Sequence, residues 1–244
     1  MKIPESHPRY ASLVQREKII EGVRRGITAT AGLIAQGRGE AFDYLIGEKT
    51  TENARRAIKV AVAKLMKAKH PVLSVNGNVA MLVAKEYIEL GEILNAPLEI
   101  NLFYRTSDRM RAIERLLQEY GCKNLLSGED ARIQVESERC KVDSRGQAIA
   151  DVVLVPLEDG DRTEALKRAG KFVITIDLNP LSRTARTADI TIVDNIVRAV
   201  PLMIKYAEEY KKQGIPEIEF NNKQNLREAL KIIKERLEDE RILD

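Results

Sequence analysis

The sequence predicts an α/β fold with a doubly wound, mainly parallel sheet, and three observations predict it. Five short runs rich in β-branched residues alternate with helical patterns after residue 70. One of them, VVLVP, is apolar at consecutive positions, as in a strand that is covered on both faces. The 244 residues, 44% of them hydrophobic, suffice for one large core. We therefore expect a single domain over residues 1–244, with a helical part at 1–70, the sheet core at 71–212, and a linker with a C-terminal helix at 213–244.

The N-terminal part is predicted to be mainly helical. Ser6 is expected to cap a first helix that ends at Gly26. The apolar segment ITATAGLIA follows, and it is expected to end at a loop around residues 37–39, Gly-Arg-Gly. The two threonines at 50–51 then provide the cap of a long helix that ends near Lys69.

The core and the C-terminal part follow from hydrophobic periodicity. The predicted strands are residues 72–75, 98–103, 151–155, 172–177 and 190–193. Residues 127–147 are polar with weak alternation and are interpreted as a loop or an irregular hairpin, and an insertion of that length is often functional. A helix is expected to begin near Ile196. After the linker at 213–222, a last helix places four apolar side chains on one face: Leu226, Leu230, Ile233 and Leu237.

Composition and charge exclude several classes of protein. The net charge of +3 lacks the one-sided basic excess that is typical of nucleic-acid binding. No apolar run reaches the roughly 18 residues of a membrane span, and the N-terminus lacks the apolar core of a signal peptide, so we expect a cytoplasmic protein without a membrane or nucleic-acid partner. Cys122 and Cys140 show no metal-binding spacing and leave open a single disulfide bond; no metal site of the protein's own is indicated.

The turn Asn76-Gly77-Asn78 is the first candidate site. It follows a predicted strand and precedes a predicted helix, where a parallel sheet binds ligands beyond the carboxyl ends of its strands. Asparagine and glycine are also the ordinary residues of a tight turn. Binding of a phosphate or substrate and a plain turn are therefore both open here.

The second candidate site lies at the ends of the last two predicted strands. Asp177 ends one strand, where a carboxylate can accept hydrogen bonds from a ribose, and Ser182-Arg183-Thr184 follows with hydroxyl and guanidinium groups suited to phosphates. The next strand brings Asp194 and Asn195 to the same edge. The alternative interpretation is a proline-containing turn with solvated charges.

The third candidate is a set of N-terminal arginines: Arg9, Arg16, Arg24, Arg25 and Arg38. Arg16 lies in the apolar stripe of the first helix, so its head group must reach solvent, pair, or point into a cleft. Arg38 lies between two glycines, which let a backbone approach closely while the guanidinium faces an anion. An exposed loop arginine is the alternative for Arg38.

Common nucleotide motifs are absent from the sequence. There is no GxxxxGK[ST] loop, the segment GRGEAF breaks the GxGxxG pattern, and neither GxSxG nor HExxH occurs. General motifs thus indicate only an α/β protein with an anion-binding cleft.

Four long strings carry a specific resemblance: SHPRYASLVQRE, GRGEAFDYLIGE, SVNGNVAML and IDLNPLSRTARTADITIVDNIVRAVP. Through them the whole chain resembles the archaeal phosphopantothenate synthetases, also called 4-phosphopantoate–β-alanine ligases. The resemblance implies a Rossmann-like homodimer that uses ATP and Mg²⁺ to join 4-phosphopantoate to β-alanine in archaeal coenzyme A synthesis, releasing AMP and pyrophosphate. By motif, it implies these ATP contacts: Arg16, Arg38, Asp177, Leu178, Asn179, Arg183, Thr184, Asn195 and Ile196.

The implied reaction fits the inventory of side chains. The carboxylate of 4-phosphopantoate would attack the α-phosphate of ATP, and the amine of β-alanine would open the acyl-adenylate. Arginines, backbone N–H groups and Mg²⁺ can stabilise the dispersed negative charge without a protein nucleophile. The substrate contacts are expected among Asn76, Gly77, Asn78, Arg105 and Arg109. Two alternatives stay open: an acid–amine ligase that releases ADP, and a nucleotide-binding module without turnover.

Overall fold

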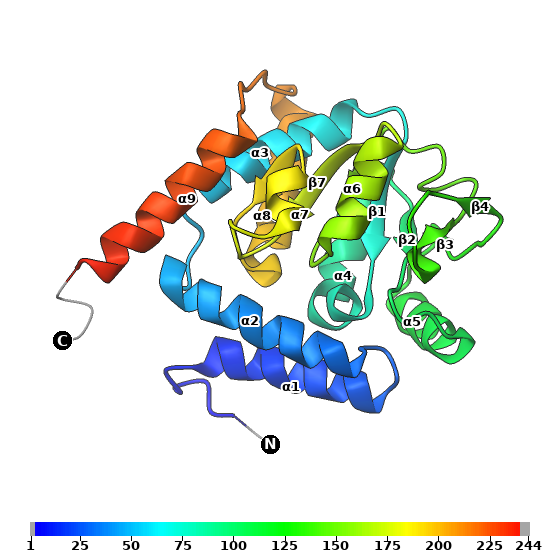
Figure 1. The fold of residues 1–244 in the computed structure, drawn as a ribbon, viewed down its shortest axis with the longest axis horizontal. Helices are drawn as coiled ribbons and strands as arrows, with labels where there is room; N and C mark the ends of the chain where they lie inside the picture. Colours follow the sequence, from blue (N-terminus) through cyan, green and yellow to red (C-terminus); the bar gives the residue numbers. More distant parts are fainter. Residues whose placement is uncertain (1–2, 240–244) are drawn as a thin grey trace.

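A six-stranded sheet forms the centre of the molecule, and helices cover both of its faces (Figure 1). The structure, a computed structural model, describes residues 3–239. All neighbouring strands of this sheet are parallel, in the order β3-β2-β1-β6-β7-β8. The strands are β1 (Pro71–Val75), β2 (Leu98–Ile100), β3 (Leu125–Leu126), β6 (Val152–Leu154), β7 (Phe172–Ile176) and β8 (Ile190–Ile192). The order reverses between β1 and β6, which confirms a Rossmann-like doubly wound sheet.

The nine helices of the described residues are α1 (Tyr10–Arg24), α2 (Thr30–Ile46), α3 (Glu52–Lys67), α4 (Gly77–Leu94), α5 (Ser107–Glu119), α6 (Gly160–Arg168), α7 (Arg183–Thr187), α8 (Ile196–Gln213) and α9 (Asn222–Leu237). Helices α3, α4, α5 and α8 cover one face of the sheet, with α6 and α7 on the other (Figure 1). None of the helices within residues 3–239 is both long and apolar enough to cross a membrane.

Strand β1 shows how consecutive apolar residues serve two cores. Leu73 and Val75 pack into the larger core under α3, α4 and α8, while Val72 packs with Leu166 of α6 on the opposite face. Successive side chains of a strand point to opposite faces, so a strand covered on both sides needs apolar residues at every position.

Two predictions for the N-terminal part are wrong. Gly37-Arg38-Gly39 is not a loop but lies inside α2, and helix α1 begins at Tyr10 instead of after a Ser6 cap. Glycine weakens a helix by only about 1 kcal/mol, and the packing of Ile46 against Leu178 and Ile233 holds α2 in place. The predicted cap of α3 is confirmed, because the Thr51 hydroxyl accepts a hydrogen bond from the Ala54 amide.

The segment 127–147 forms the irregular hairpin. Strand β4 (Ala131–Arg132) pairs antiparallel with β5 (Lys141–Val142), and a 3₁₀ turn (Glu138–Cys140) lies between them. Edge strand β3 was not predicted, because its two residues are too short for a periodic pattern. Strand β2 ends at Ile100, short of the predicted residue 103. Cys122 and Cys140 are free thiols.

The C-terminal helix α9 follows the predicted linker and packs against α2, α3 and β8. Leu226 and Ile233 are buried as the apolar stripe predicts, whereas Leu237 is 71% exposed and lies outside the packed part of the stripe.

The pair α1 and α2 lies across the carboxyl ends of the strands (Figure 1). At one end of the pair, the Ile27–Thr28 backbone fits so closely over Gly77 that a Cβ there would clash with Ile27 O and lie 3.0 Å from Thr28 Cα. At the other end, Ile46 and Leu178 share a small apolar cluster. The two helices therefore form a roof over the strand ends that sequence analysis selected.

Candidate functional site

The turn after β7 is built around Asp177. One carboxylate oxygen accepts the Asn179 amide at 2.9 Å, and the other binds the Ser182 hydroxyl. Ser182 in turn caps α7, since its Oγ accepts the Ala185 amide at 2.9 Å. Burial raises the pKa of the Asp177 carboxyl, although Ser182, Asn179 and the charge of Arg38 act to lower it. This turn is a polar, ordered rim at the carboxyl edge.

Helix α2 brings Arg38 to this turn from more than a hundred residues away. The charge of Arg38 acts on the Asp177 carboxyl, and a Cβ on Gly39 would lie 3.5 Å from Leu178 Cδ1. The backbone of α2 at Gly39 therefore lies next to Leu178, whereas a Cβ on Gly37 would meet nothing within 4 Å. The structure thus brings together two of the regions that sequence analysis selected.

The strand end after β8 is a buried polar network. Asn195 caps α8, accepting the Val197 amide at 3.2 Å, and its amide nitrogen donates to Asp43 of α2 at 2.8 Å and to Gln15 of α1 at 3.0 Å. Arg198 binds Asp43 at 2.5 Å and Asp194 at 2.7 Å. Burial raises the pKa of Asp194 against the opposing effect of Arg198. The network fixes the start of α8, at Ile196, beneath the roof.

Arg16 pairs with Glu40 between α1 and α2. Glu40 also accepts hydrogen bonds from Tyr44 at 2.7 Å and from Arg9 at 3.3 Å. Burial acts to raise the pKa of Glu40, but the hydrogen bonds from Arg16 and Tyr44 outweigh it, so this pKa is lowered. The Arg16 side chain remains 43% exposed and can meet a ligand without leaving its partner.

Arg183 and Thr184 have different surroundings. The Thr184 hydroxyl donates to Glu158 O at 2.9 Å and ties α7 to the loop after β6. Arg183 instead pairs with Asp161 and Glu164 of α6, on the surface. A ligand would have to draw Arg183 from two carboxylates.

The turn Asn76-Gly77-Asn78 has a structural role, because it forms the start of α4. The Asn76 Oδ1 accepts the Asn78 and Val79 amides, while its nitrogen donates to Pro156 O and Leu157 O after β6. The Asn78 nitrogen donates to Gly32 O of α2 at 3.0 Å. The turn therefore joins β1, β6 and the roof at the point where the strand order reverses; its role toward a substrate stays a prediction.

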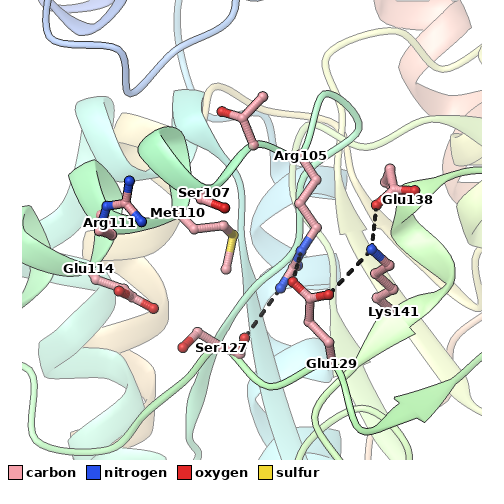
Figure 2. A pocket seen from close by; sticks show the side chains of 10 residues that line it. Arg105, Ser107, Met110, Arg111, Glu114, Ser127, Glu129, Glu138 and Lys141 are labelled. Atoms are coloured by element: carbon pink, nitrogen blue, oxygen red, sulfur yellow. Dashed lines mark hydrogen bonds and ion pairs between the residues drawn. The ribbon is translucent and has the colours of Figure 1, made fainter.

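Beside β2, α5 and the hairpin line an open polar cavity of about 430 Å³, drawn in Figure 2. Arg105 points into it between Ser127 and Glu129, with its Nε 2.9 Å from a Glu129 oxygen. Lys141 meets Glu129 and Glu138 there. The cations of this cavity are already matched by carboxylates.

Sequence reasoning missed several polar residues of the site: Glu40, Asp43, Arg139 and Arg198. Asp194 and Arg198 are four residues apart at a predicted helix start. This spacing favours an ion pair and could have indicated Arg198 from the sequence. Glu40 and Asp43 gain their roles from contacts across the chain. Among residues 3–239, no group of three or more His, Cys, Asp or Glu side chains is arranged to hold a metal ion.

Comparison with known proteins decides the family. The profile of the phosphopantothenate/pantothenate synthetase family matches residues 53–236. The chain is 61% identical to the 4-phosphopantoate–β-alanine ligase of Thermococcus onnurineus over 97% of this chain and 94% of that one. The chain belongs to this synthetase family.

More distant members of the synthetase family keep the similarity along their whole length. The 4-phosphopantoate–β-alanine ligase of Methanosarcina mazei is 52% identical over 96% of this chain and 95% of its own. That of Methanospirillum hungatei is 49% identical over 96% and 98%. The resemblance stated from four sequence strings is confirmed, and so is the prediction of an enzyme of the ligase class.

Proposed function

We propose that this synthetase is an ATP-dependent, AMP-forming ligase that joins 4-phosphopantoate to β-alanine in archaeal coenzyme A synthesis. The observation that carries the proposal is full-length identity of 49% to 61% with ligases named for these two substrates. The α2 roof over the polar turns after β7 and β8 supports it, since doubly wound sheets bind nucleotides at their carboxyl edge.

The ATP site in this proposal lies under α1 and α2. Asp177, with Leu178 and Asn179, would hold the ribose. Arg16 and Arg38 would meet the triphosphate, because guanidinium groups bind phosphate oxygens by paired, charge-assisted hydrogen bonds. The remaining contacts in the proposal are Arg183, Thr184, Asn195 and Ile196. The proximity of Arg38 to Asp177 supports this grouping.

Mg²⁺ would enter this site with the nucleotide. Magnesium in nucleotide sites is commonly held by one or two carboxylates together with phosphate oxygens, so a protein cage is not required. Asp177 is the carboxylate at these strand ends that could take part, because Asp194 is fully buried and both its oxygens are bound by Thr50, Asn195 and Arg198. Bound there, Mg²⁺ would neutralise charge on the phosphates.

In this mechanism the protein positions the reactants and stabilises the charge that develops on the phosphate. The acid's carboxylate attacks the α-phosphorus, pyrophosphate leaves, and the β-alanine amine then displaces AMP from the acyl carbon. Fixed arginines stabilise the charge that spreads over the phosphate oxygens, and pre-oriented partners gain the advantage of proximity. The substrate side of the cleft in this proposal comprises Asn76, Gly77, Asn78, Arg105 and Arg109.

A nucleotide assay tests the proposal. Purified protein would be incubated with ATP, Mg²⁺, 4-phosphopantoate and β-alanine, omitting each in turn, and AMP would be separated from ADP. AMP together with 4′-phosphopantothenate is expected only in the complete mixture. Formation of ADP would show that the acid is activated as an acyl phosphate and not as an adenylate. Saturable ATP binding without turnover would indicate a nucleotide-binding module. The homodimer also stays a prediction, which light scattering after size-exclusion chromatography measures.

A further inference from the structure

Arg109, in the first turn of α5, is a partly buried cation without a carboxylate partner. Its Nη2 donates to Ile27 O at 2.9 Å and its Nη1 to Tyr104 O, while its buried Nε has no hydrogen-bond partner. It makes no ion pair with any residue from 3 to 239. Arg105, four residues earlier, is paired with Glu129. A buried guanidinium that only backbone carbonyls meet is poorly compensated and is suited to an anionic ligand.

Arg139, from the hairpin, lies against the same segment as Arg109: its guanidinium is over the Phe103 ring, and Arg109 donates to the O atom of the adjacent Tyr104. Burial lowers the pKa of Arg109, and the positive charge of Arg139 lowers it further. Arg139 itself pairs with Glu158 and with Asp159, the latter at 2.6 Å, and its guanidinium lies over the Phe103 ring, 5.5 Å from the ring centre. Two guanidiniums therefore approach one another while the carboxylates contact only one of them.

A third guanidinium, that of Arg162, lies next to Arg139. Arg162 is fully buried, and the charges of Glu99 and Asp159 both act on its guanidinium. Burial raises the pKa of Glu99 to about 7, so this carboxyl is only partly ionised at neutral pH. The carboxyl group that acts on Arg162 from β2 therefore carries only part of a negative charge.

Buried polar side chains hold the Arg139 backbone in place. Asn101, at the end of β2, donates to Arg139 O and Lys141 O, and Arg162 of α6 also donates to Arg139 O. Glu99 accepts the Asp143 and Gln147 amides further along the same segment. Burying polar groups is costly unless they have partners, and the Asn101 amide nitrogen and the Glu99 carboxylate find theirs in the backbone of the hairpin. The result is a fixed Arg139.

The pair lies where the strand order reverses. Arg109 binds Ile27 O, which lies directly over Gly77 at the start of α4. The partners of Arg139, Glu158 and Asp159, follow β6 in the loop that Asn76 holds. The same loop contacts a proposed nucleotide residue, because the Thr184 hydroxyl donates to Glu158 O, so the arginine pair borders the proposed nucleotide site.

We propose that Arg109 and Arg139 bind the phosphate ester of the acid substrate. The inference deepens the proposed function and rests on it for the identity of that acid. A phosphate dianion would supply the negative charge that Arg109 lacks. From β2 to β7 the sheet edge spans three strand spacings, roughly 14 Å. With its phosphate at the arginine pair, the acid's carboxylate extends along that edge toward the α-phosphate of ATP.

The same pair would make the enzyme specific for the phosphorylated acid. An acid without the phosphate leaves the two guanidiniums uncompensated, and a site built for a charged group rejects an analogue that lacks it. Arg109→Gln is therefore expected to raise KM for 4-phosphopantoate about 10- to 100-fold, because it removes a hydrogen bond to a charged group and a loss of this size corresponds to such a bond. The KM for ATP should change less than about threefold, and the preference for 4-phosphopantoate over pantoate should fall.

The experiment has two readouts and a matched control. Steady-state kinetics would compare wild type, Arg109→Gln, the conservative Arg139→Lys, and Arg111→Ala, which removes an exposed charge from the same helix. Calorimetric titration of 4-phosphopantoate without ATP would measure the same binding independently of turnover. Wild-type binding that Arg109→Gln weakens, with Arg111→Ala unchanged, supports the inference even if no ligase activity is found. Arg109→Gln with unaltered affinity for 4-phosphopantoate, or with a raised KM for ATP alone, overturns it while leaving the ligase intact.

Discussion

One edge of the Arg16 guanidinium binds both oxygens of the Glu40 carboxylate, Nε to Oε2 and Nη2 to Oε1, each at 2.8 Å. The hydrogen bond from the Tyr44 hydroxyl fixes the carboxylate, so the guanidinium plane is set before any ligand arrives. Among the described residues, Nη1 of Arg16 has no partner. Glu40 thus positions Arg16 for the triphosphate of the proposed reaction.

Glu40→Gln is expected to weaken ATP binding about 5- to 30-fold, because an amide holds the guanidinium by a neutral and less directional bond. Isothermal titration with ATP measures this directly. Glu21→Gln is the control, since the exposed Glu21 side chain of α1 forms a surface ion pair with Arg24 at 3.7 Å. Equal ATP affinity of Glu40→Gln and wild type would show that Arg16 does not depend on this carboxylate.

Gly77→Ala is expected to destabilise the fold by about 2 to 4 kcal/mol, because the new methyl group meets the Ile27–Thr28 backbone, which cannot move aside as a side chain would. Urea unfolding gives the free energy. Gly37→Ala is the counterpart: nothing lies within 4 Å of its Cβ and it is inside α2, so it should stabilise by about 0.5 to 1 kcal/mol. A neutral Gly77→Ala would mean that the roof does not lie this close.

The strands of the core and the helix that contains Gly37 show what the sequence could and could not predict. The strands of the core were predictable, because β-branched runs and polar turns are local signals. The helix through Gly37 and Gly39 was not, because the contacts of Ile46 with Leu178 decide it and those contacts join distant segments. Asp177 and Arg38 were selected in sequence. Their proximity, and the part of Glu40 in setting Arg16, emerged only in three dimensions.

Asp43→Ala is expected to cost about 2 to 4 kcal/mol of folding free energy, because it leaves Arg198 with one carboxylate and Asn195 with one acceptor in a buried network. Chemical unfolding measures this. Glu228→Ala removes a comparable ion pair with Arg56 at the surface and should cost no more than about 1 kcal/mol. Similar losses for the two variants would refute a special role for the network.

Glu99 predicts a specific pH dependence of stability. Burial is the largest influence on its pKa and raises it in the folded protein from 4.5 to about 7. Two backbone hydrogen bonds and the charge of Arg162 act to lower this pKa. Between these pH values the folded protein keeps a proton that the unfolded chain releases. The stabilisation from Glu99 is therefore fully present below pH 4.5 and is lost as the pH rises through 7.

Glu99→Gln removes this titration while keeping the shape of the side chain. The difference in unfolding free energy, wild type minus Glu99→Gln, should fall by about 2 to 3 kcal/mol from pH 5 to pH 8. Urea titrations at both pH values measure it, with Glu89→Gln on the exposed face of α4 as the control. A difference that is the same at both pH values would mean that Glu99 is ionised throughout. An ionised Glu99 would then balance more of the positive charge of Arg162, beside Arg139.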